Sequence, residues 1–118
     1  MIKGEGWYGQ EASKQVKFDM EIFSDGSKVF GKIFNEVLPN GRFLPPATFS
    51  GVFDGQQFLG EKFYKGMFHN HIYYRLEIVG ELNYEGIFMI SFSPVPVFNC
   101  EHALVKGKVS ITFEKPLL

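Results

Sequence analysis

The stretch that decides the fold is Lys14–Ser24, KQVKFDMEIFS, which the dipeptide Asp25-Gly26 follows. Its side chains alternate between two faces, apolar Val16, Phe18, Met20 and Ile22 against charged Lys17, Asp19 and Glu21. A period of two is typical of a strand with one buried face, and Asp-Gly is a strong signal for a tight turn. The segment therefore predicts a β-hairpin, with residues 27–35 as the returning strand.

The same period continues along the chain, and no stretch has the period of 3.6 that marks an amphipathic helix. We expect eight strands joined by connections short enough for antiparallel neighbours, at residues 6–10, 14–24, 27–35, 48–53, 58–68, 72–79, 84–93 and 103–114. An eight-stranded meander can close on itself and so remove its exposed edges. The 118 residues therefore predict one all-β domain over residues 1–118, a small antiparallel up-and-down barrel. A two-sheet β-sandwich is the alternative.

Composition excludes several classes of function. Twelve Lys and Arg against thirteen Asp and Glu give a net charge of -1, which argues against nucleic-acid binding and against a polybasic membrane anchor. The single cysteine, Cys100, excludes an intrachain disulfide, and no apolar signal core follows the N-terminus. We therefore expect a soluble cytoplasmic protein with neither nucleic acid nor membrane as a partner.

A local motif, aromatic-x-Gly-apolar-Phe, occurs at residues 49–53, 64–68 and 84–88, with a looser copy at 30–34. Glycine between aromatic residues lets a strand coil sharply while rings from the next strand cover its bare backbone. The motif therefore predicts strong curvature of the sheet.

The motif also resembles the core of a MORN repeat, most closely at residues 49–55, where Asp54-Gly55 follows it. That resemblance would imply a scaffold that binds proteins or lipids. We do not assign the family, because the copies are unevenly spaced and the repeat's later Gly-x-Gly is absent.

The opening Gly4-Glu5-Gly6-Trp7 resembles the first strand of the calycin group, the lipocalins and avidins, which carries a Gly-x-Trp. The spacing differs here, and the other tryptophans of an avidin pocket are missing. The resemblance is one of architecture, and it implies ligand binding inside a barrel by analogy.

Strand order predicts where a site lies, because alternate connections of a meander fall at opposite ends. The tight turns at 25–26, 54–55 and 80–83 share one end, and the long connections at 10–13, 36–46, 69–71 and 94–102 share the other. Barrel pockets open at their mouths, and functional groups gather on loops. We therefore expect a ligand site at the long-loop end. The candidate ligand-binding residues are Trp7, Arg42, Tyr64, His69, His71, Tyr74 and His102.

These residue types suit the orientation of a ligand. Tyr64, Tyr74 and Trp7 combine an apolar body with a polar tip, and we expect them to line the interior, with plain core packing as the alternative. The histidines and Cys100 match no recognised metal-site spacing, so we predict no metal. Phosphate loops, serine-elbow motifs and paired catalytic carboxylates are absent from the sequence, so we predict no cofactor and assign no catalytic residue.

The fourteen phenylalanines pose a packing problem, because several strands carry large apolar groups on both faces. Val29 and Ile33, for example, oppose Phe30 and Phe34. A barrel buries only its inner face, and an uncovered apolar outer face favours association. We therefore expect a homodimer packed through the third, fourth and seventh strands.

Three functions remain open. The first, which we adopt, is a barrel that binds a small apolar or aromatic molecule through its long-loop end, and it requires a cavity. The second is an interaction or scaffold module that acts through exposed Phe-rich strand faces. The third and least favoured is a small cyclase or isomerase that uses Tyr64, Tyr74, Arg42 or a histidine, and it requires buried polar groups with perturbed pKa values in the cavity.

Overall fold

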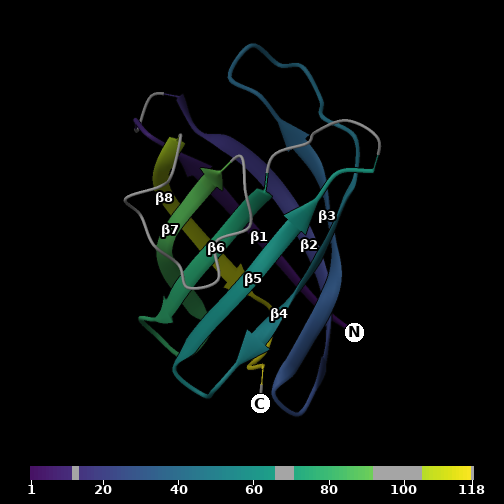
Figure 1. The fold of residues 1–118 in the computed structure, drawn as a ribbon, viewed down its shortest axis with the longest axis vertical. Coiled ribbons are helices and arrows are strands. Elements are labelled where there is room, and N and C mark those ends of the chain that lie inside the picture. The colour runs from purple at the N-terminus through teal and green to yellow at the C-terminus, as the bar shows by residue number, and fades with distance from the viewer. Residues whose placement is uncertain (12–13, 66–70, 92–104, 118) are drawn as a thin grey trace.

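The computed structural model describes residues 1–11, 14–65, 71–91 and 105–117. Its strands are β1 (Ile2–Gly9), β2 (Val16–Asp25), β3 (Lys28–Val37), β4 (Ala47–Phe53), β5 (Gln57–Phe63), β6 (His71–Ile78), β7 (Asn83–Ser91) and β8 (Val105–Phe113). They form a closed barrel in chain order, with every neighbouring pair antiparallel and β8 paired back to β1 (Figure 1). The predicted eight-stranded up-and-down barrel is confirmed, and the sandwich alternative is excluded. Among the described residues, no helix has the length and apolar character needed to cross a membrane.

The two ends of the barrel differ as the sequence predicts. In Figure 1 the tight turns β2–β3, β4–β5 and β6–β7 lie at the lower end, and the long β3–β4 loop projects from the upper end. We call this upper end the long-loop end. The predicted strand boundaries are less accurate: β1 begins at Ile2 rather than Gly6, and β5 ends at Phe63 rather than Phe68.

The core is the interior of the barrel, which aromatic rings largely fill. On β2 the predicted apolar face is the inner one, and its four side chains are buried. Phe49 stacks on Phe58 with ring centroids 5.2 Å apart and also contacts Tyr74 at 5.5 Å. Nearer the turn end, Tyr84 packs edge-on against Phe113. Each such ring removes a large apolar area from water, and these pairs add specific geometry to the core.

The glycines of the aromatic motif mark places where neighbouring backbones approach closely. A Cβ at Gly51 would overlap the carbonyl oxygen of Leu59 across the β4–β5 pair, and one at Gly86 would overlap that of Arg75. Among the described residues, the ring cover that the motif predicts occurs at glycines outside the motif. The ring of Phe49, for example, occupies the space that a Cβ of Gly60 would need.

A bulge in β3 changes which of its side chains face inward. Lys17 pairs with Val37 but Asp19 pairs with Phe34, so β3 holds one extra residue opposite β2. Asn35 adopts a left-handed φ of 53° there, and its Nδ2 donates a hydrogen bond of 2.9 Å to Asp19 Oδ2. Asn35 is exposed as a result, and Glu36 points into the barrel. The sequence prediction that ended this strand at Asn35 and placed Glu36 in a loop was wrong, because a bulge breaks the period of two.

Candidate functional site

Two charged side chains are buried inside the barrel, Glu36 from β3 and Lys62 from β5, at 0% and 3% exposure. Lys62 Nζ donates to Glu36 Oε2 at 2.7 Å. Burial of two charges is costly unless they pair closely and their remaining hydrogen-bonding groups are satisfied. The contact between them meets the first condition.

Three tyrosines complete this arrangement. The hydroxyl of Tyr8 donates to Glu36 Oε2 at 2.6 Å, and the hydroxyl of Tyr64 donates to Glu36 Oε1. Lys62 Nζ also donates to the hydroxyl oxygen of Tyr74 at 3.4 Å. We call these five residues, Tyr8, Glu36, Lys62, Tyr64 and Tyr74, the polar cluster. Both carboxylate oxygens of Glu36 therefore accept hydrogen bonds from side chains.

The ammonium of Lys62 lies among aromatic rings as well. Its Nζ is 4.6 Å from the ring centroid of Tyr8 and 4.7 Å from that of Tyr64. A cation this close to a ring face is attracted by the negative face of the ring, and the attraction is stronger away from water. These rings replace part of the hydration that Lys62 loses on burial.

Burial sets the protonation of the cluster. It raises the pKa of Tyr8, Tyr64 and Tyr74 well above the ordinary tyrosine value, so their hydroxyls keep their protons. Burial lowers the pKa of Lys62 to about 8, although the adjacent Glu36 carboxylate acts in the opposite direction. The tyrosines are thus hydrogen-bond donors at neutral pH, and Lys62 titrates only slightly above it.

A cavity of about 140 Å³ lies beside the cluster. Four cluster members, the three tyrosines and Lys62, form part of its wall. The other described residues of its wall are apolar: Leu44, Ile72, Phe88 and Ile90. Leu44 belongs to the β3–β4 loop, and its backbone N–H donates to the carbonyl of Glu36 at 2.9 Å. The cavity therefore lies toward the long-loop end, with polar groups on one side and apolar groups on the other.

The structure brings two of the predicted site residues together. Tyr64 and Tyr74 both line the cavity, which agrees with their expected interior position. Arg42 lies apart from them, exposed in the β3–β4 loop. His71 is the first residue of β6, opposite Ser91, while His69 and His102 lie outside the described residues. Ligand binding by any of these residues stays a prediction.

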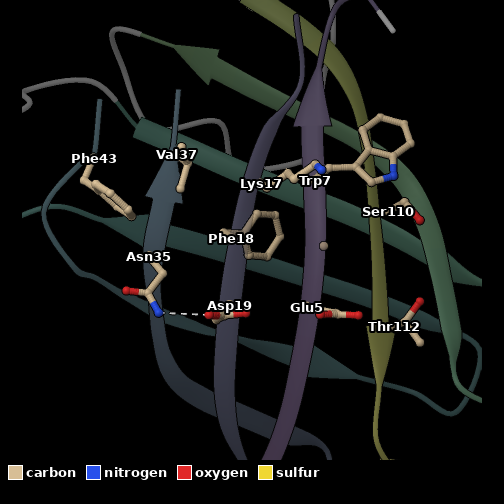
Figure 2. Close-up of a pocket in the computed structure, with 11 residues that line it drawn as sticks. Glu5, Trp7, Lys17, Phe18, Asp19, Asn35, Val37, Phe43, Ser110 and Thr112 are labelled. Carbon is tan, nitrogen blue, oxygen red and sulfur yellow. Dashed lines mark hydrogen bonds between the residues drawn. The ribbon is translucent and has the colours of Figure 1, made fainter. Parts of the chain in front are cut away.

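Trp7 was expected in the interior and lies on the outer face instead. Tyr8 points into the barrel, so its neighbour Trp7 must point outward because side chains alternate along a strand. Figure 2 shows Trp7 at an outer groove of about 700 Å³ that runs over β8, β1, β2 and β3. Glu5, Asp19 and Thr112 are among the polar side chains along it. This groove lies on the outer face of the sheet, whereas the cavity lies among side chains of the barrel interior.

Sequence reasoning missed Tyr8, Glu36 and Lys62. A signal for Lys62 was present, because it continues the alternate positions of Phe58 and Gly60 on the inner face of β5. Glu36 carried no such signal, since its inward direction depends on the bulge at Asn35. Tyr8 was hidden by its neighbour Trp7, whose larger ring drew the interior assignment.

Comparison with known proteins returns no match: the chain matches no family model, no curated protein and no solved structure. Function is therefore argued from the geometry of the site.

Proposed function

We propose that the barrel binds a small apolar or aromatic molecule in the cavity beside the polar cluster. The observation that carries this proposal is the cavity itself, about 140 Å³ with a largely apolar wall. An apolar protein cavity of roughly 150 Å³ is large enough to bind benzene. The expected ligand is therefore the size of a single ring.

The polar cluster supports the proposal because it holds one wall of the cavity in place. Glu36 is bonded to groups from β1 and β5 and to Tyr64, which follows β5. Collapse of the cavity would require these buried hydrogen bonds to break, and a buried group left without its partner costs about 1–3 kcal/mol. A preformed cavity of this kind binds a ligand with little reorganisation.

Titration with benzene tests the proposal. Backbone amide resonances of residues around the cavity are expected to shift in a saturable way in ¹H–¹⁵N NMR spectra. Ile90→Phe fills the cavity and is expected to abolish these shifts. Ile87→Phe is the matched control, because it adds the same atoms on the outer face of the same strand. Equal binding by both variants would place the ligand elsewhere and refute the proposal.

A second candidate function is protein contact through the outer face, and the exposed phenylalanines favour it. Phe23 and Phe30 face each other across the β2–β3 pair, 45% and 48% exposed, with ring centroids 6.0 Å apart. They line an outer groove, and Phe63 of β5 is also exposed. Large exposed apolar side chains in such proximity are typical of association surfaces.

We keep the homodimer as the proposed form of this contact. The sequence predicted an interface on β3, β4 and β7; the exposed Phe23 and Phe30 favour β2 and β3 in place of β7, and Val52 of β4 is exposed as well. On β7 the outward residues Ile87 and Met89 are half-buried and buried. Light scattering behind size-exclusion chromatography is expected to give twice the monomer mass, and Phe23→Ser combined with Phe30→Ser is expected to give the monomer. A monomeric wild type would refute the homodimer.

A cytoplasmic location also stays a proposal, supported by the single cysteine.

A further inference from the structure

Most hydrogen bonds of the polar cluster end on the carboxylate of Glu36. The two oxygens of Glu36 receive the hydroxyls of Tyr8 and Tyr64 and one N–H of Lys62. A second N–H of Lys62 goes to the hydroxyl oxygen of Tyr74 over a long 3.4 Å. Tyr74 therefore accepts in this network, and its own O–H has no acceptor among the residues that the structure describes.

This donor belongs to one of the most deeply buried residues of the barrel. Tyr74 is 1% exposed, and it forms part of the cavity wall. A buried hydroxyl without an acceptor is unfavourable by about 1–3 kcal/mol. The raised pKa of Tyr74 means that the hydroxyl does not escape this cost by ionising. An acceptor supplied from the cavity would relieve it.

We infer that the ligand of this cavity carries a neutral carbonyl oxygen, which accepts a hydrogen bond from the hydroxyl of Tyr74. The weakly bound N–H of Lys62 that now reaches Tyr74 is the second donor available to the same oxygen. This inference rests on the proposed function, since it concerns the ligand of the same cavity. It narrows that ligand to a small cyclic or aromatic ketone, aldehyde or ester.

The charge of the cluster favours a neutral acceptor over a carboxylate. Lys62 is already paired with Glu36 at 2.7 Å, so the cluster presents no uncompensated positive charge. A second carboxylate would be desolvated and repelled by Glu36. A carbonyl offers two lone pairs without a net charge, which matches the two donors, the hydroxyl of Tyr74 and an N–H of Lys62.

Two probes of matched shape test the inference: cyclopentanone and methylenecyclopentane, which differ only by C=O against C=CH₂. Each has as many non-hydrogen atoms as benzene. Their dissociation constants are measured by NMR titration of the wild type and of Tyr74→Phe, which removes only the hydroxyl. The variant is expected to bind the ketone about three- to tenfold more weakly, the effect of one lost hydrogen bond, and the alkene with unchanged affinity.

Tyr84→Phe is the matched control. Tyr84 is also buried, but it packs on Phe53 and Phe113 toward the turn end. The Tyr84→Phe variant is expected to leave the dissociation constants of cyclopentanone and methylenecyclopentane unchanged. A second measurement uses the wild type alone: the carbonyl stretching band of bound cyclopentanone is expected at lower frequency than in a hydrocarbon solvent, as hydrogen bonding requires.

The outcomes separate the inference from the proposed function. Equal weakening of ketone and alkene by Tyr74→Phe, or an unshifted carbonyl band, would overturn the inference and leave ligand binding in the cavity intact. Absence of binding by benzene and by both probes would overturn the two together. Selective weakening of the ketone, with an unaffected Tyr84→Phe control, supports both.

Discussion

The carboxylate of Glu36 and the ammonium of Lys62 lie 2.7 Å apart in the barrel interior, and both side chains are buried. They come from strands that are not neighbours, since β4 separates β3 from β5. Their contact therefore crosses the interior rather than following the sheet. It links the cavity wall to the bulge that turns Glu36 inward.

Lys62→Met tests how much the protein depends on this pair. The variant removes the hydrogen bond that Lys62 Nζ donates to the buried carboxylate of Glu36, and a buried charged group left without such a partner is expected to cost about 1–3 kcal/mol or more. Urea unfolding at pH 7, followed by circular dichroism, measures this loss of unfolding free energy. The double variant Glu36→Gln/Lys62→Met removes both charges and is expected to recover most of it. A double variant as unstable as Lys62→Met would show that the lysine contributes through its packing and not through its hydrogen bond to Glu36.

The lowered pKa of Lys62 predicts an unusual dependence of stability on pH. The pKa is about 8 in the folded protein, against an ordinary value of 10.5 for lysine. Between pH 8 and 10.5 the unfolded chain therefore holds this proton more strongly than the folded protein does. Stability rises with pH wherever the unfolded state holds more protons. The cost of burying charged Lys62 is therefore fully present below pH 8 and declines as the pH rises above it.

At higher pH the three cluster tyrosines lower the unfolding free energy as the pH rises, opposite to the effect of Lys62. Their raised pKa values keep them protonated in the folded barrel, while in the unfolded chain they ionise near pH 10. Unfolding free energies are thus expected to rise from pH 8 toward 10 and to fall beyond it. Urea unfolding across this range checks the maximum, and Glu36→Gln/Lys62→Met is expected to lose the rising part only. A rise of equal size in that double variant would assign it to other groups.

Asn35 offers a direct test of the bulge that places Glu36. Its φ of 53° is costly for a β-branched residue but easy for glycine. Asn35→Val and Asn35→Gly both remove the amide that binds Asp19. The difference between their unfolding free energies therefore measures the backbone strain at this position. Asn35→Val is expected to be less stable than Asn35→Gly by about 1–3 kcal/mol in urea unfolding. Equal stabilities would show that β3 adopts another register without penalty.

The alternation of apolar and charged residues predicted strands with one buried face, and the short connections predicted antiparallel neighbours. The barrel was preferred to a sandwich because closure removes exposed edges. The long-loop end followed from strand order, and Tyr64 and Tyr74 do line the cavity there. Glu36 could not be predicted in the same way. Its inward direction depends on one extra residue in β3 and on a left-handed Asn35, neither of which leaves a periodic signal. The site is thus visible from sequence where the period holds and hidden where a bulge breaks it.

Gly60 and Phe49 show that the close packing of rings on glycine is itself testable. Gly60→Ala places a methyl group where the ring of Phe49 now lies and is expected to cost about 1–3 kcal/mol of unfolding free energy. Gly80→Ala is the matched control, because its added methyl meets only the Asn83 side chain at 3.4 Å or more, and it is expected to change stability by no more than about 0.5 kcal/mol. Phe49→Leu replaces the ring by a smaller side chain and so makes room for the added methyl group. The double variant is therefore expected to lose less unfolding free energy than the sum of the two single variants. Strict additivity in urea unfolding would mean that the backbone, and not the ring, excludes a side chain at Gly60.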